Sequence, residues 1–233
     1  MSEDRTQHTA FQRERERMVE RQIEQRGISD ERVLSAMREV PRHKFVPDHL
    51  ASAAYRDAPL PIDQGQTISQ PYIVALMTAE LGLTGGEKVL EIGAGSGYQA
   101  AILSRLAREV ISVERIPALA REAQELLDAL GYDNVRIVVG DGTEGWPDQA
   151  PYDAIIVTAA APEVPEPLKG QLADGGRLLV PVGPRWTQQL TRVRRVGKEF
   201  HTESLLGVAF VPLIGEHGWQ DRGSVRLGGK ETM

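Results

Sequence analysis

The 233-residue chain contains no cysteine, and aromatic residues make up only 5% of it. A chain without cysteine can form no disulfide, present no thiolate nucleophile and bind no metal through sulfur. Its apolar runs fall well short of the roughly 20 residues that span a bilayer. Its polar first residues are not followed by the apolar stretch of a secretory signal. We therefore expect a cytoplasmic protein that does not enter membranes.

Positive charge is also scarce, because 27 Lys and Arg face 33 Asp and Glu, for a net charge of −6. Proteins that bind nucleic acids neutralise phosphates with clustered basic residues, so we expect no nucleic-acid partner. The five histidines lack the HxH or HExxH spacing of metal-binding motifs, so we expect no metal site. The three tryptophans stand apart from one another, which favours packing over a binding role: Trp146, Trp186 and Trp219.

Residues 89–97 contain the most informative pattern, a short apolar run followed by glycines at alternate positions 93, 95 and 97. Glycine removes side chains where the backbone bends sharply and a ligand comes close. The dinucleotide fingerprint G-x-G-x-x-G needs a glycine where the chain has Tyr98. The observed E-x-G-x-G-x-G is instead typical of S-adenosylmethionine (SAM) sites, where the carboxylate of Glu91 suits a cationic ligand. A simple strand-to-helix link is the alternative reading.

Two more acids follow the next apolar runs. Glu114 lies about 20 residues beyond the first glycine, where a nucleotide-binding βαβ unit places the acid that bonds ribose hydroxyls. Asp141, between Gly140 and Gly142, is predicted to reach an adenine amino group. A solvated Glu114 and a turn-forming Asp141 are the alternatives. Acids at three successive strand ends favour a nucleotide-type site.

Alternating apolar and helical patterns predict an α/β fold, a doubly wound, mostly parallel sheet. The resemblance given below implies that this fold is of the Rossmann-like SAM-dependent methyltransferase type. Two strands without an intervening helix, at 188–197 and 200–213, predict an antiparallel C-terminal edge. A helix over 11–26 and a second one capped by Ser29 form an N-terminal helical extension. The other predicted elements are strands 88–92, 110–114, 135–139, 153–158 and 176–182, and helices 71–83, 98–107, 117–130 and 165–173.

The domain prediction has four regions. Residues 1–10 are a disordered tail, and residues 11–70 are N-terminal helices and an irregular substrate-cleft loop. Residues 71–215 form the SAM-binding catalytic domain, and 216–233 a loose polar tail. The irregular loop ends at Thr67, Ser69 and Gln70, just before Pro71 opens a helix. The free N–H groups and dipole of a helix N-terminus favour an anion there.

Six blocks of sequence resemble the protein-L-isoaspartate (D-aspartate) O-methyltransferase family, over nearly all of residues 18–215. They are residues 40–47 (VPRHKFVP), 66–71 (QTISQP), the glycine turn 91–97, 140–142 (GDG), 158–162 (TAAAP) and 210–213 (FVPL). The glycine turn marks only the broad SAM superfamily. The blocks at 40–47 and 66–71 are far more selective.

The resemblance implies that SAM donates a methyl group to the α-carboxylate of L-isoaspartyl, and some D-aspartyl, residues in damaged proteins. The ester then closes to a succinimide that opens in part to normal aspartate. Ser69 is implied as the active-site residue, and the substrate is implied to contact Thr67, Ile68, Gln70 and Val211. The SAM-binding set is implied to be Glu91, Gly93, Ala94, Gly95, Ser96, Gly97, Glu114, Arg115, Asp141, Gly142 and Thr158. We expect a monomer whose partners are isoaspartyl proteins and peptides.

The chemistry needs no general base, because a carboxylate with a pKa of about 4 is already ionised at neutral pH. We therefore expect the Ser69 hydroxyl to position the carboxylate, with a helix-capping serine as the alternative. Recognition is expected to rely on the peptide main chain, since damage arises in many sequence contexts. A small-molecule or RNA methyltransferase and an inactive SAM-binding module stay open as other functions.

Overall fold

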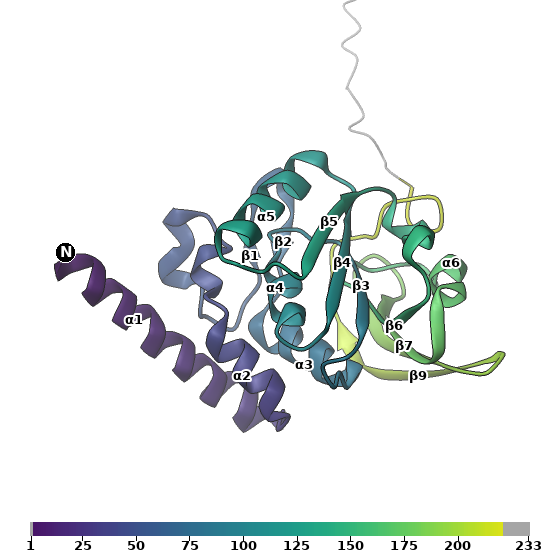
Figure 1. Ribbon diagram of the computed structural model, residues 1–233, viewed down its shortest axis with the longest axis horizontal. Helices are drawn as coiled ribbons and strands as arrows, with labels where there is room; N and C mark the ends of the chain where they lie inside the picture. Colours follow the sequence, from purple (N-terminus) through teal and green to yellow (C-terminus); the bar gives the residue numbers. More distant parts are fainter. Residues whose placement is uncertain (1, 221–233) are drawn as a thin grey trace, which may run out of the picture.

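The computed structural model describes residues 2–220 and contains a central seven-stranded sheet with helices packed against it (Figure 1). Five neighbouring strands are parallel, as predicted. In order across the sheet they are β5 (Val135–Val139), β4 (Glu109–Glu114), β3 (Lys88–Ile92), β6 (Tyr152–Val157) and β7 (Leu172–Val182). The antiparallel strands β8 (Gln188–Val196) and β9 (Glu199–Val208) complete the edge, which confirms the predicted fold class.

The inner strands β3, β4, β6 and β7 bury side chains on both faces of the sheet, because alternate residues point in opposite directions. In β3, Val89 belongs to a core shared with the N-terminal helices, whereas Leu90 belongs to a second core with Leu168 of α6 (Glu166–Gly170). Four helices bury residues in the first core: α2 (Glu31–Glu39), α3 (Pro71–Leu81), α4 (Tyr98–Ser104) and α5 (Pro117–Ala129).

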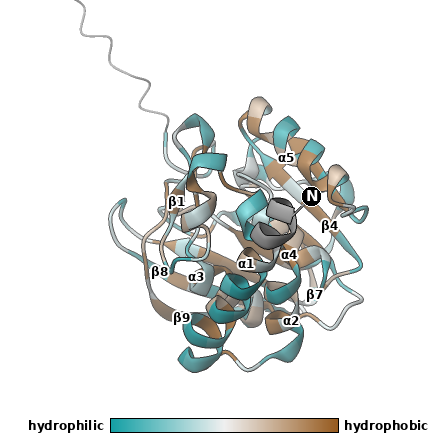
Figure 2. Cartoon of the chain, turned by 90° about the vertical axis from the view of Figure 1, so that its left-hand side faces the viewer, coloured by the Kyte–Doolittle hydropathy of each residue, from teal (hydrophilic) through white to brown (hydrophobic). Residues whose placement is uncertain are grey.

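Helix α5 carries hydrophobic and hydrophilic residues side by side, as expected for a helix with one buried face (Figure 2). Its buried residues include Leu119, Ala123 and Leu127. Within residues 2–220 no helix is long and apolar enough to cross a membrane.

The N-terminal extension is helical from its start. Helix α1 (Ser2–Met18) runs into a π-helical turn, Val19–Ile23, and a 3-10 turn, Glu24–Arg26, that ends at Gly27 with φ 97°. The disordered tail predicted over residues 1–10 stays a prediction, although residues 2–10 belong to this helix. No proline or glycine precedes Gly27, so no helix-breaking residue type stands in this segment. The predicted N-cap of α2 is wrong, because Asp30 and not Ser29 caps this helix. The Asp30 side chain accepts a hydrogen bond from the Arg32 amide at 2.9 Å. The four-region division otherwise stays a prediction.

The last predicted strand ends earlier than expected, at Val208 instead of residue 213. Residues 210–213 leave the sheet edge and bond to the segment that follows β6. There the Ala160 amide donates to the Val211 carbonyl, and the Leu213 amide donates to the Ala160 carbonyl, both at 2.8 Å. This parallel pairing brings the C-terminal segment beside the carboxyl ends of the parallel strands.

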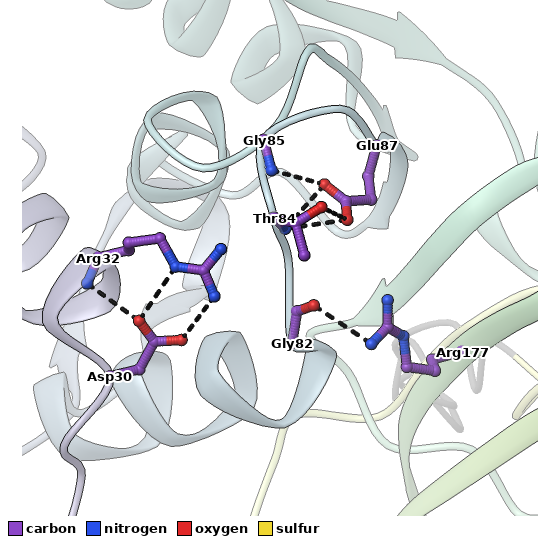
Figure 3. A network of polar contacts seen from close by, with 7 residues as sticks. All are labelled: Asp30, Arg32, Gly82, Thr84, Gly85, Glu87 and Arg177. Atoms are coloured by element: carbon purple, nitrogen blue, oxygen red, sulfur yellow. Dashed lines mark hydrogen bonds and ion pairs between the residues drawn. The ribbon is translucent and has the colours of Figure 1, made fainter.

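The turn between α3 and β3 is closed by Glu87 (Figure 3). Its carboxylate accepts hydrogen bonds of 2.7–3.0 Å from the Thr84 hydroxyl and from the amides of Thr84 and Gly85. Burial alone would raise the pKa of Glu87, but these hydrogen bonds outweigh it and hold the pKa below its ordinary value of 4.5. Because Glu87 directly precedes β3, the closed turn helps to set where that strand begins.

We expect Glu87→Gln to lower the free energy of unfolding by about 1–3 kcal/mol at pH 7, because an amide nitrogen replaces an acceptor oxygen. The pKa of Glu87 is lower in the folded protein than in the unfolded chain. Its contribution is therefore full above about pH 4.5 and is lost as the pH falls through the lowered folded value. Urea unfolding of both proteins at pH 7 and pH 3 measures this. A stability difference of equal size at both pH values would show that the carboxylate is not its source.

Candidate active site

A cleft runs across the carboxyl ends of β4, β3 and β6, and Thr67 and Thr158 line each of its three adjoining parts. The glycine part is lined by residues 93–96 together with Ile68, Ser69, Met77 and Phe210. The Glu114 part is lined by Glu114, Arg115, Ile116, Gly142, Val211 and Leu213, among others. The outer part is lined by Pro59, Ser69, Gln70, Trp186, Val208 and Val211, among others.

The glycine turn needs residues without side chains. Gly93, Gly95 and Gly97 have φ values of 95°, 53° and 85°, in the left-handed region that favours glycine. A Cβ at Gly93 would lie 2.5 Å from the Thr158 hydroxyl oxygen, closer than two such atoms can approach. That hydroxyl is 2.7 Å from the Gly93 carbonyl and 2.9 Å from the Ile92 carbonyl, so it donates within this turn. The contact fixes the turn against the end of β6.

Glu114 is nearly buried, with 7% of its surface exposed, and it closes one side of the cleft. One carboxylate oxygen accepts a hydrogen bond from the Gly95 amide at 3.0 Å, and the other accepts from the Ile116 amide at 2.9 Å. Each oxygen keeps a further lone pair. A buried carboxylate with two acceptor sites fits a pair of neighbouring hydroxyls, as on a ribose. The apolar side chains of Ile116 and Leu213 line the same part of the cleft and suit a flat ring.

Glu91 does not line the cleft. Its side chain is fully buried in the sheet, where the Ser112 hydroxyl donates to one of its oxygens at 2.5 Å and the other oxygen has no partner in the described part of the chain. Burial, with a smaller effect from Glu114, raises the pKa of Glu91 to about 8. The acid is therefore largely protonated at neutral pH, and the expectation that it faces a cationic ligand is wrong in this structure.

The Asp141 carboxylate bonds to neighbouring residues of the protein and is not among the residues that line the cleft, although the adjacent Gly142 is. One of its oxygens accepts from the Thr143 amide and hydroxyl, at 2.9 and 2.7 Å, and the other from the Glu216 amide at 2.8 Å. Burial tends to raise the pKa of Asp141, but the hydrogen bonds from Glu216 and Thr143 outweigh burial and lower it.

The segment 214–219 folds back over Asp141, so the loose tail predicted from residue 216 is wrong for these residues. The Trp219 amide donates to the Leu213 carbonyl at 2.7 Å, and the His217 amide donates to the Thr143 hydroxyl at 3.0 Å. Residues 221–233, the rest of that predicted tail, lie outside the described part of the chain. Ile116, Leu213 and Ile214 line the cleft and were not predicted as site residues. The sequence block at 210–213 was the available signal for Leu213.

Of the predicted active-site and substrate residues, Thr67, Ser69, Gln70 and Val211 line the outer part of the cleft, and Ile68 lines the glycine part. Thr67 and Ile68 form strand β2 (Thr67–Ile68), which pairs with β1 (Leu60–Pro61). Ser69 lines both the glycine part and the outer part. Gln70, not Ser69, is the N-cap residue of α3, so the helix-cap alternative for Ser69 is wrong. Within residues 2–220 the structure assigns the Ser69 hydroxyl no hydrogen-bond partner, which leaves it available to a ligand.

The parallel sheet with a glycine turn after β3 and an acid at the end of β4 defines the SAM-dependent methyltransferase fold. The sequence profile described as "Protein-L-isoaspartate(D-aspartate) O-methyltransferase (PCMT)" matches residues 13–218. The chain belongs to this family.

Curated relatives agree with the family match. The protein-L-isoaspartate O-methyltransferase of Methanoculleus marisnigri is 60% identical over 209 residues, which cover 89% of this chain and 94% of the relative. Protein-L-isoaspartate O-methyltransferase 1 of Syntrophobacter fumaroxidans is 57% identical over 210 residues, covering 90% and 98%.

Two solved structures are similar over most of the chain. One, a protein-L-isoaspartate O-methyltransferase, is 34% identical, with a TM-score of 0.78, and covers 88% of this chain and 67% of the other. A putative protein of the family from Plasmodium falciparum, solved with S-adenosyl-L-homocysteine, is 28% identical, with a TM-score of 0.75, covering 86% and 98%.

The family match confirms the function that the sequence blocks predicted. The chain is a SAM-dependent protein carboxyl O-methyltransferase. It methylates the α-carboxylate of L-isoaspartyl, and some D-aspartyl, residues in damaged proteins. The resulting ester leads through a succinimide to normal aspartate.

Gly93→Ala tests the close approach at the glycine turn. Gly131→Ala is a matched control, because Gly131 also has a positive φ, of 76°, but has nothing within 4 Å of its Cβ position. Both variants carry backbone strain of about 1–3 kcal/mol. Only Gly93→Ala also pushes against Thr158, so we expect it to lose more unfolding free energy and to bind SAM more weakly in calorimetry. Equal losses in the two variants would contradict a steric role for Thr158.

Glu91→Gln tests the buried acid. The pKa of Glu91 is about 8 in the folded protein against an ordinary 4.5, so folding retains a proton that the unfolded chain releases. The wild type therefore loses stability as the pH rises from about 4.5 to about 8. The glutamine variant lacks this slope, and its stability relative to wild type should rise by about 1 kcal/mol or more between pH 5 and pH 8. Urea unfolding at both pH values measures the change. If the unfolding free energies of the two proteins changed with pH in the same way, the raised pKa of Glu91 would be contradicted.

Proposed function

We propose that the Glu114 part of the cleft binds the adenosyl end of SAM and that Ser69 holds the carboxylate of the isoaspartyl substrate. The observation that carries this proposal is that Ser69 and the glycine turn line one part of the cleft, while Glu114 closes the adjoining part. A ligand that spans both parts therefore extends from Glu114 toward the Ser69 hydroxyl. The S-adenosyl-L-homocysteine found with the Plasmodium falciparum protein is a ligand of this type.

Side chains bind the adenosyl end of the cofactor, and the backbone of the glycine turn accommodates its amino-acid end. Glu114 accepts hydrogen bonds from the ribose hydroxyls, while Ile116 and Leu213 contact the base. The turn formed by Gly93, Ala94, Gly95, Ser96 and Gly97 leaves room for the amino-acid end, with Thr158 beside it. Arg115 and Gly142 line the Glu114 part and lie beside the adenosyl end. Glu91 and Asp141 act indirectly, by fixing the strand and the segment that surround the ligand.

SAM, when bound, supplies an electrophilic methyl group on a positively charged sulfur. The substrate carboxylate is ionised at neutral pH, so no residue has to remove a proton. Ser69 donates its hydroxyl proton in a hydrogen bond to one carboxylate oxygen and leaves the other free to react. Ile68, Met77 and Phe210 line the glycine part and exclude water. Such orientation can supply roughly 7–11 kcal/mol of the rate enhancement.

The substrate chain lies along Thr67, Ile68, Gln70 and Val211 in this proposal. The cleft wall here is backbone-rich, because residues 210–213 are held in extended pairing with Ala160. An extended peptide can contact such a wall through its main chain, whatever its sequence.

We also propose that the enzyme acts as a cytoplasmic monomer, without a metal ion or a nucleic-acid partner. The net charge of −6 supports the last point, since it disfavours binding to phosphates. Among residues 2–220 no three His, Asp or Glu side chains gather in a way that could hold a metal ion. The absence of a metal stays a prediction, which an assay with chelator checks.

Ser69→Ala should lower kcat for an isoaspartyl peptide by about 10- to 100-fold, because a hydrogen bond to a charged group contributes about 1.5–3 kcal/mol. The free energy of unfolding should change little, since Ser69 does not cap α3. Ser35→Ala, an exposed serine on α2, is the matched control. The measurement is methyl transfer to an isoaspartyl peptide beside its normal aspartyl twin. A kcat of Ser69→Ala equal to that of the wild type would contradict the positioning role of Ser69. Equal turnover of the isoaspartyl and the aspartyl peptide would contradict the proposed substrate.

A further inference from the structure

Trp186 lies in the connection between β7 and β8, and 88% of its surface is exposed. The expectation that it packs in the interior is therefore wrong. A single exposed apolar residue needs no special explanation, but Trp186 lines the outer part of the cleft, which Ser69 and Thr158 also line. A large aromatic side chain thus lies in solvent at the entrance to the active site.

The connection that carries Trp186 is held in place on both sides of it. The Arg185 guanidinium lies 4.9 Å from the centre of the Trp219 ring and donates to the Gln220 carbonyl at 3.4 Å. The Gln188 side chain donates to the Pro184 carbonyl at 2.8 Å. Fixed neighbours reduce the ordering cost when a ligand meets the ring, which is the usual benefit of preorganisation.

The outer part of the cleft is uncharged. None of its lining residues within the described chain is Asp, Glu, Lys or Arg, and its apolar members include Pro59, Ile73, Val208 and Phe210. An isoaspartyl residue whose carboxylate reaches Ser69 is joined to further residues of the damaged protein. Those flanking residues must leave the cleft past its outer part, where Trp186 and the apolar residues offer an uncharged surface among threonine, serine and glutamine side chains.

We propose that Trp186 forms a subsite for the side chain next to the isoaspartyl residue, and that it favours apolar and aromatic neighbours. This inference rests on the proposed placement of the carboxylate at Ser69. It adds a side-chain preference to the main-chain recognition that the rest of the cleft supports. Trp186 is a specificity-determining residue in this proposal and does not touch the reacting atoms.

The test compares two isoaspartyl peptides, one with phenylalanine on each side of the isoaspartyl residue and one with glycine there. We expect the ratio of their kcat/KM values to favour the phenylalanine peptide in the wild type. In Trp186→Ala the ratio should fall about tenfold, as expected for one lost aromatic pair, with the change in KM rather than in kcat. Trp186→Phe keeps an aromatic face and should retain most of the preference.

Phe200→Ala is the matched control, because it removes another partly exposed aromatic ring, 39% exposed, outside the cleft lining. It should leave the ratio unchanged. Trp186 fluorescence, taken as the difference between wild type and Trp186→Phe, should shift to shorter wavelength when the phenylalanine peptide binds. An unchanged ratio in Trp186→Ala, with both peptides still methylated, overturns this inference alone. A wild type that methylates neither peptide overturns the proposed function and this inference with it.

Discussion

The carboxylate of Glu114 accepts hydrogen bonds from the amides of Gly95 and Ile116, and so joins three elements at one point. Gly95 lies in the turn after β3, Glu114 ends β4, and Ile116 is the N-cap residue of α5. A buried carboxylate without such donors would be costly. The glycine turn therefore keeps its shape because the next strand supplies an acceptor for it. The same oxygens face the cleft, so one group both shapes the site and binds within it.

The remaining walls of the cleft come from segments that are distant in sequence. The strand pair β1–β2 supplies Thr67 and Ile68, and the pairing of residues 210–213 with Ala160 supplies Val211. Thr158 lies where these segments meet the glycine turn, and its hydroxyl bonds to the backbone there. The small residues that follow Thr158 allow the C-terminal segment to approach the strand ends closely. The site thus depends on backbone pairing between segments far apart in the chain.

Much of the fold follows from local patterns. The predicted strands 88–92 and 135–139 match β3 and β5, because each is a short run of mainly β-branched and other apolar residues with a glycine directly after it. The orientation of side chains was harder to predict. Glu91 points into the sheet, and Asp141 bonds to Glu216, because tertiary contacts that no local pattern encodes decide both. The packing role predicted for Trp186 was wrong for a similar reason. The distance between tryptophans in the sequence carries no information about which of them lies beside a cleft.

The segment 210–219 has a consequence for how the enzyme is made. It forms one wall of the cleft and bonds to Asp141 and Thr143, yet it follows every strand of the sheet in the order of synthesis. A nascent chain can assemble the parallel strands and the glycine turn while this segment is still inside the ribosome. Its cleft then lacks a wall. Competence to repair other proteins therefore arrives only after this segment has left the ribosome and paired with the strand ends.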